Sequence, residues 1–120
     1  MGDAGAPDYG HRLLPHIVDE KARLDPQGEA FFVPHSDNPE DGWKPITWKE
    51  YANAINHTAR IIIEECGSPA TGATPTVAYI GPNDGRYVVV VVAAVKAGYK
   101  VRSVSPIRHS RLLDWANITF

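Results

Sequence analysis

Five consecutive valines, at residues 88–92, constrain the fold of this chain more than any other feature. Side chains branched at Cβ favour strands, so the run alone predicts β structure. An Asp-Gly pair precedes it, however, and two alanines and Gly98 follow it. These residues are typical of the start and the end of a helix. We therefore predict a helix over about residues 84–97, with Asn83 or Asp84 as its N-cap.

A short strand is predicted on each side of this helix. Residues 76–81 are mostly apolar and lead into a Pro-Asn-Asp-Gly turn, and residues 101–104 begin a second strand. Consecutive strands joined by a helix lie parallel, with a right-handed crossover. Parallel sheets are normally covered on both faces, which accounts for a helix as apolar as this one. The other predicted elements are too few to provide that cover.

The N-terminal half predicts a helix followed by a β-hairpin. Four apolar residues fall on one face of the helix, namely Leu14, Ile17, Val18 and Leu24. Pro15 suits the first turn, and residues 25–28 stop the helix. Residues 30–33 and 45–48 are expected to pair as two short strands across a polar loop at 35–42.

A longer helix follows, and it has the clearest start signal in the chain. Thr47 and Glu50 have the spacing of a capping box, in which each side chain accepts a hydrogen bond from the other residue's backbone N–H. An apolar face continues behind it, formed by Trp48, Tyr51, Ala52, Ile55, Ala59, Ile62 and Ile63. Cys66 and Gly67 end the helix. The predicted fold is therefore α/β, in the order helix, hairpin, helix, strand, helix, strand.

Composition limits the classes of partner. The chain has 120 residues, enough for one domain, and its formal net charge of −2 comes without a basic stripe that would suit nucleic acid. A single cysteine rules out an intramolecular disulfide and fits a reducing compartment. The first ten residues do not resemble a secretory signal, and the apolar run at 87–95 is shorter than the roughly 20 residues of a spanning helix. We expect a cytoplasmic protein without membrane or nucleic-acid partners.

Four segments together resemble one family, namely residues 9–15, 46–50, 77–87 and 93–101. They are similar to the N-terminal stretch of the adenylation (AMP-binding) domain of fungal nonribosomal-peptide-synthetase-like (NRPS-like) carboxylic acid reductases. These enzymes belong to the acyl-adenylate-forming superfamily. The resemblance implies fungal secondary metabolism and a partial N-terminal subdomain of an adenylate-forming enzyme.

The resemblance also divides the chain into three parts: a flexible N-terminus at 1–8, a partial adenylation domain at 9–106 and a divergent C-terminal tail at 107–120. After Val101 the sequence departs from the family pattern, with Ser105 and Pro106 as a last similarity. A shifted reading frame, a retained intron or a decayed gene would each produce this departure.

The chemistry of the family is implied by the resemblance alone. Its adenylation domain condenses a carboxylate with ATP and moves the acyl group to a phosphopantetheine thiol, and a reductase domain releases the product with NADPH. The first step needs Mg²⁺, lysines and backbone donors around the phosphates. No segment of this sequence matches those motifs, so we assign no catalytic, cofactor-binding or metal-binding residue. ATP, Mg²⁺, phosphopantetheine and NADPH are implied only for a full-length parent.

Other polar segments have simpler structural explanations. The loop at 71–76 has no lysine and leads into a strand, whereas a phosphate cradle leads into a helix. The turn at 82–85 does open a helix, but Asp84 would repel an anion, which favours a helix cap. The histidines lack the spacing of metal ligands; they are His11, His16, His35, His57 and His109.

Cysteine and aromatic side chains are also expected to be structural. Cys66 follows two glutamates that disfavour its thiolate, so we expect a buried thiol at the helix end. Trp43, Trp48 and Tyr51 could form an aromatic platform, although core packing and hairpin contacts are the expected use.

Three hypotheses for function remain. The favoured one is a truncated relative of an AMP-dependent synthetase, without activity alone. The alternative is an interaction module that pairs with a synthetase or with itself through the apolar helix at 87–95, which begins with Tyr87 and ends with Val95. The third is a small-ligand binder at the helix N-terminus near Asn83.

Overall fold

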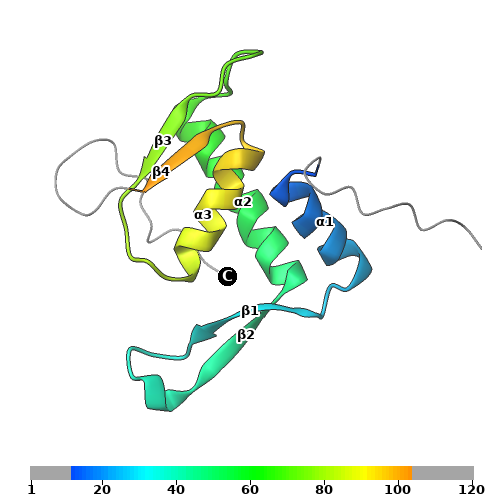
Figure 1. The fold of residues 1–120 in the computed structure, drawn as a ribbon, viewed down its shortest axis with the longest axis vertical. Coiled ribbons are helices and arrows are strands. Elements are labelled where there is room, and N and C mark those ends of the chain that lie inside the picture. Colours follow the sequence, from blue (N-terminus) through cyan, green and yellow to red (C-terminus); the bar gives the residue numbers. More distant parts are fainter. Residues whose placement is uncertain (1–11, 104–120) are drawn as a thin grey trace, which may run out of the picture.

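The computed structural model describes residues 12–103, and the predictions made for residues 1–11 and 104–120 lie outside this range. Figure 1 shows a group of packed helices, with the β1–β2 hairpin projecting from one end and the short β3–β4 pair beside α3. The elements in chain order are α1 (Leu14–Leu24), β1 (Glu29–Pro34), η1 (Pro39–Asp41), β2 (Trp43–Thr47), α2 (Trp48–Cys66), β3 (Thr76–Tyr79), α3 (Gly85–Lys96) and β4 (Lys100–Ser103). This order confirms the predicted α/β arrangement.

Helix α1 has a narrower buried side than its sequence suggests. Pro15 lies in the first turn and is buried, as is Val18. Leu14 and Leu24 belong to the predicted apolar face, and they are 52% and 62% exposed. Both residues lie at the ends of the helix, and the buried positions of α1 are Pro15 and Val18.

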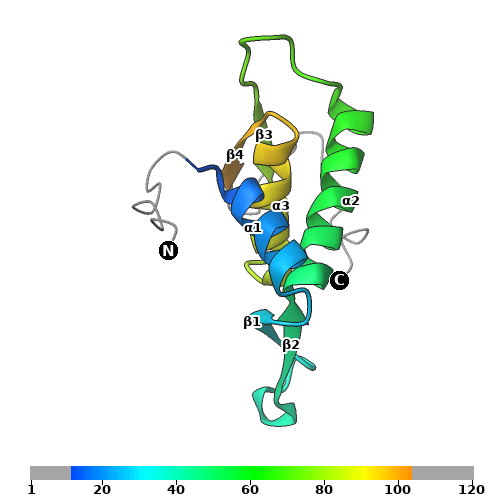
Figure 2. The same ribbon diagram turned by 90° about the vertical axis from the view of Figure 1, so that its right-hand side faces the viewer.

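Strands β1 and β2 form the predicted antiparallel hairpin. Phe31 pairs with Ile46, and Pro34 pairs with Trp43 at the loop end. A bulge lies between Glu29 and Phe31. The second strand begins two residues earlier than predicted, because the loop already turns back through η1. Figure 2 shows the hairpin extending away from the helices.

Helix α2 begins with the predicted capping box. The Glu50 backbone N–H donates to Thr47 Oγ1 at 3.2 Å, and the Thr47 N–H donates to Glu50 Oε2 at 3.0 Å. Two of the first N–H groups of a helix would otherwise lack partners. The helix therefore starts immediately where the hairpin ends.

The valine run is helical, as predicted. Asp84 caps α3, and its carboxylate accepts a hydrogen bond from the Arg86 backbone N–H. At the other end Gly98 has φ +92°, its N–H donates to Val95 O at 3.1 Å, and the Tyr99 N–H donates to Ala94 O at 2.8 Å. This pair of bonds is a Schellman motif, which needs a left-handed residue at the glycine position.

Strands β3 and β4 pair in parallel around α3, also as predicted, with Val77 opposite Val101. Val77 and Tyr79 are buried and Val101 packs against the same core. The alternate residues of β4, Lys100 and Arg102, are exposed. Within residues 12–103 the sheet is therefore covered on one face, and its other face carries basic side chains.

The core lies where the helices meet one another and the small sheet. Helix α2 packs against α3, and α1 contacts both helices. Fully buried side chains include Ile55 and Ile62 of α2 with Val89 and Val90 of α3. Two further contacts tie α3 to its neighbours. Tyr51 Oη donates to Val88 O at 3.3 Å, and Lys96 Nζ lies 2.7 Å from Asp19 Oδ2.

One buried side chain does not fit this apolar core. Thr58 of α2 is 3% exposed, and its hydroxyl has no hydrogen-bond partner. A buried hydroxyl without a partner costs stability, because it has lost its hydrogen bonds to water.

Among the helices of residues 12–103, none combines the length and the apolar character of a membrane-spanning segment.

Candidate functional site

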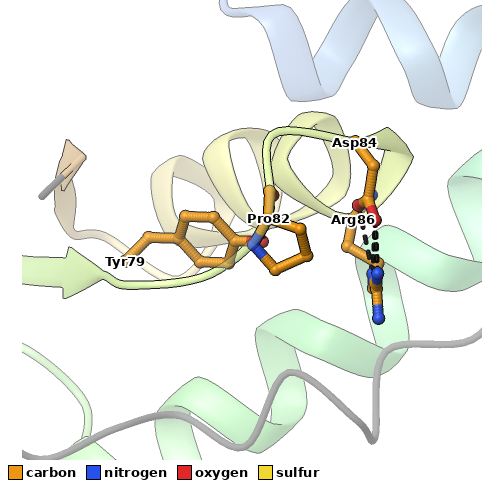
Figure 3. Close-up of polar contacts among 4 residues, drawn as sticks. All are labelled: Tyr79, Pro82, Asp84 and Arg86. Carbon is orange, nitrogen blue, oxygen red and sulfur yellow. Dashed lines mark hydrogen bonds and ion pairs between the residues drawn. The ribbon is translucent and has the colours of Figure 1, made fainter. Parts of the chain in front are cut away.

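The turn between β3 and α3 is the position where a site is most readily expected. In open sheets with parallel strands, ligands bind beyond the carboxyl ends of the strands, often at a helix N-terminus. Figure 3 shows the four residues that shape this turn: Tyr79, Pro82, Asp84 and Arg86. Their contacts show whether the helix N-terminus is open to a ligand.

Tyr79 holds the first half of the turn. Its hydroxyl donates to Pro82 O at 2.8 Å (Figure 3). The centroid of its ring lies 5.5 Å from that of the Tyr87 ring. Burial raises the pKa of the Tyr79 hydroxyl, and the charge of Asp84 raises it further. Gly81 fits beneath this ring because a Cβ there would lie only 2.6 Å from Tyr79 Oη. Tyr79 therefore acts as a structural donor that stays protonated.

Asp84 and Arg86 close the second half of the turn. Asp84 Oδ1 accepts from the Arg86 backbone N–H at 2.9 Å, and Arg86 Nε donates to both carboxylate oxygens at 3.0 Å. Arg86 Nη2 also donates to Asp84 Oδ2 (Figure 3). The bonds from Arg86 hold the pKa of Asp84 below its ordinary value, and the same carboxylate raises the pKa of Arg86.

This arrangement already supplies the negative charge that a helix N-terminus favours. A second anion would meet the Asp84 carboxylate at close range. The Tyr87 N–H donates to Asp84 O, so another first-turn donor is also occupied. The geometry therefore supports the predicted helix cap, and it offers no cradle for a phosphate at Asn83.

The other residues singled out in the sequence do not come together as a site. His16, His35 and His57 are exposed and lie on separate elements. Within residues 12–103 no three histidine, cysteine, aspartate or glutamate side chains are grouped so that they could hold a metal ion. His11 and His109 lie outside the described residues. The loop at 71–76 is exposed up to the start of β3 and leads into that strand.

Cys66 differs from its prediction. It is a free and exposed cysteine at the end of α2, whereas a buried thiol was expected. Its backbone is the part that is used: Tyr99 Oη donates to Cys66 O at 3.0 Å and to Gly67 O at 2.5 Å. The tyrosine thus ties the end of α2 to the start of β4 and leaves the thiol outside the core.

The aromatic residues separate into two groups. Trp48 and Tyr51 lie 6.3 Å apart between ring centroids, and Phe31 meets Tyr51 edge-on at 5.0 Å. These three rings fix the hairpin against α2, which is the structural use expected for Trp48 and Tyr51. Trp43 does not join them; it is 60% exposed on the hairpin. The contact of Phe31 with this group was not predicted from the sequence. The available signal is that Phe31 and Phe32 are consecutive in a strand, so one of them must face the core.

Comparison with known proteins finds several relatives, of which two are described here, while no family model matches the chain. A carboxylic acid reductase of Neurospora crassa is 48% identical over 105 residues, which is 88% of this chain and 10% of the reductase. An isocyanide synthase-NRPS hybrid, crmA, of Aspergillus fumigatus is 37% identical over 98 residues, which is 82% of this chain and 6% of the hybrid.

The chain is related to fungal NRPS-like proteins. It spans about a tenth of the length of the reductase and less of the hybrid. In the fold, the segments that carry the NRPS-like resemblance lie at the start of α1, at the junction of β2 with α2, and in the β3–α3–β4 unit on both sides of the valine run. These elements contain the helix caps and the parallel strand pair described above, so the residues that carry the resemblance are ones with a structural role.

Proposed function

We propose that this chain corresponds to the N-terminal part of an acyl-adenylate-forming domain and does not form an acyl-adenylate alone. The observation that carries the proposal is the 48% identity to a carboxylic acid reductase of which the chain spans only 10%. The β3–α3 turn supports it, because the Asp84 carboxylate at the helix N-terminus already accepts hydrogen bonds from the backbone and the side chain of Arg86. No donor set for triphosphate is present at that turn.

The test is pyrophosphate release by the purified chain with ATP, Mg²⁺ and a panel of carboxylic acids. We expect no release above a boiled control. An acid-dependent release that disappears on boiling would refute the proposal. The Neurospora crassa carboxylic acid reductase is included as a control, because the proposal expects acid-dependent pyrophosphate release from a full-length relative.

A second candidate is an interaction module that pairs through α3 with a synthetase or with another copy. Val88 and Val95 of α3 are each 40% exposed, and they lie on one side of the helix with Val91. The rest of the helix is largely buried, so the available surface is a narrow stripe. This stripe suits a partner whose apolar side chains cover the exposed valines and so extend the hydrophobic core.

Complementation tests this candidate. The Neurospora crassa reductase would be produced without the segment that matches this chain, and the chain would be added in trans. Restored reductase activity that is lost with Val88→Ser and Val95→Ser would support pairing through α3. Failure to restore activity, with both proteins folded and mixed at high concentration, would count against it.

A further inference from the structure

The two faces of the β1–β2 hairpin have different surroundings. On the inner face Phe31 lies opposite Ile46; Ile46 is fully buried, and Phe31 contacts the Tyr51 ring. This face is the one that attaches the hairpin to α2. A hairpin with one packed face normally presents polar side chains on the other.

The outer face is instead apolar. Phe32 lies opposite Pro45 and Pro34 lies opposite Trp43, so four apolar residues adjoin on one side of the hairpin. All four are exposed, with Phe32 at 51% and Trp43 at 60%. We call these four residues the hairpin face. Adjoining exposed apolar residues that include a tryptophan are typical of an interaction site.

The prolines limit how a partner can bind. Each strand of this two-stranded sheet has an open edge, and an edge usually invites another strand. Pro34 and Pro45 have no N–H to donate, so each strand has a gap in the row of donors it could present. A partner is therefore expected to contact the side chains of the hairpin face rather than to extend the sheet.

The loop beside this face determines the preferred charge of the partner. It joins Pro34 to Trp43 directly, and it contains Asp37, Glu40 and Asp41 without any lysine or arginine. Internal bonds hold it in place: the Glu40 N–H donates to Asn38 Oδ1 at 3.1 Å, and Ser36 Oγ donates to Asp41. The next lysine along the chain, Lys44, lies opposite Val33 and so belongs to the inner face.

From these observations we infer that the hairpin face is a docking surface for a partner segment that combines apolar with basic side chains. Apolar groups cover Phe32 and Trp43, while lysine or arginine pairs with the carboxylates of the loop and stacks on the indole. A second copy of this chain is a poorer occupant. It would present the same acidic loop and no basic residue from its own hairpin face.

The full chain can be tested with a defined probe. The probe is a short peptide in which leucine and lysine alternate, and its control replaces each lysine by glutamate. Isothermal titration at low and high salt measures the affinity. We expect the lysine peptide to bind, added salt to weaken it, and the glutamate peptide not to bind.

Variants locate the binding surface. Trp43→Ser should lower the affinity for the lysine peptide by about tenfold or more. Leu24→Ser is the matched control, because Leu24 is exposed to the same degree as Trp43 but lies on α1. The double change Asp37→Asn with Glu40→Gln should weaken binding and reduce its salt dependence. All of these side chains are exposed, so equal melting temperatures are expected.

Four outcomes would overturn the inference. The first is no binding of the lysine peptide, and the second is equal binding of both peptides. The third is an equal loss of affinity with Leu24→Ser and Trp43→Ser. The fourth is a dimer in light scattering that Trp43→Ser dissociates, because the face would then be occupied by a second copy.

Discussion

Replacing Thr58 by valine should stabilise the protein, because the Thr58 hydroxyl is buried without a partner. Valine has almost the same shape, and its intrinsic helix propensity is close to that of threonine. An unsatisfied buried polar group costs about 1–3 kcal/mol. Some of this gain is lost because a methyl group is slightly larger than a hydroxyl in a close-packed core. We expect a net gain of about 1 kcal/mol, which for a chain of 120 residues corresponds to roughly 3–6 °C in Tm.

Urea unfolding followed by circular dichroism measures this change as a shift in midpoint at an unchanged slope. Thr58→Ser is the matched variant, since it keeps the hydroxyl and removes the methyl group. It should lose about 1 kcal/mol of stability. The reasoning is refuted if Thr58→Val is less stable than the parent chain while Thr58→Ser is neutral. That pattern would mean that the hydroxyl makes a stabilising hydrogen bond.

Three further predictions concern the caps and the turn. Thr47→Ala removes one half of the capping box and should cost about 1 kcal/mol in urea unfolding. Gly98→Ala should cost about 1–2 kcal/mol, because φ is +92° and the new Cβ would lie 3.1 Å from Pro69; Gly72→Ala, with φ +81° and no neighbour within 4 Å, should cost less. Arg86 lowers the pKa of Asp84 in the folded state. The ionised Asp84 carboxylate therefore stabilises the fold above its ordinary pKa of 3.8, and this stabilisation is lost as the pH falls through the lowered pKa. Thermal melts between neutral and acidic pH should show this loss in the parent chain and a smaller one in Asp84→Asn.

Local signals predicted most of the secondary structure. The Thr47 and Glu50 pair identified the start of α2, and the Asp-Gly and Gly98 signals overruled the strand preference of five valines. These predictions succeeded because a cap depends on a few neighbouring residues and its hydrogen bonds are made within one turn. The parallel pairing of β3 and β4 followed from their connection through a helix.

The errors concern burial, which depends on neighbours distant in sequence. An apolar periodicity gives the side of a helix that prefers cover, but it does not say where the cover stops: Leu24 lies on the apolar side of α1 and is 62% exposed. Cys66 was expected to be buried, yet its thiol is exposed, and Tyr99 hydrogen-bonds to its backbone carbonyl. The candidate site at the β3–α3 turn was correctly expected to be a cap. The hairpin face was missed, because alternation alone does not say which of Phe31 and Phe32 packs inward.

The ion pair between α1 and α3 has a consequence for the order in which the chain is made. Asp19 and Lys96 are 77 residues apart, so the ribosome needs roughly 4–15 s at about 5–20 residues per second to deliver the second partner after the first. Helix α2 is available sooner, but the surface of α1 that faces α3 waits for the whole interval. During synthesis α1 can therefore pack against α2 before it meets α3, and its contacts with α3 are among the last to form.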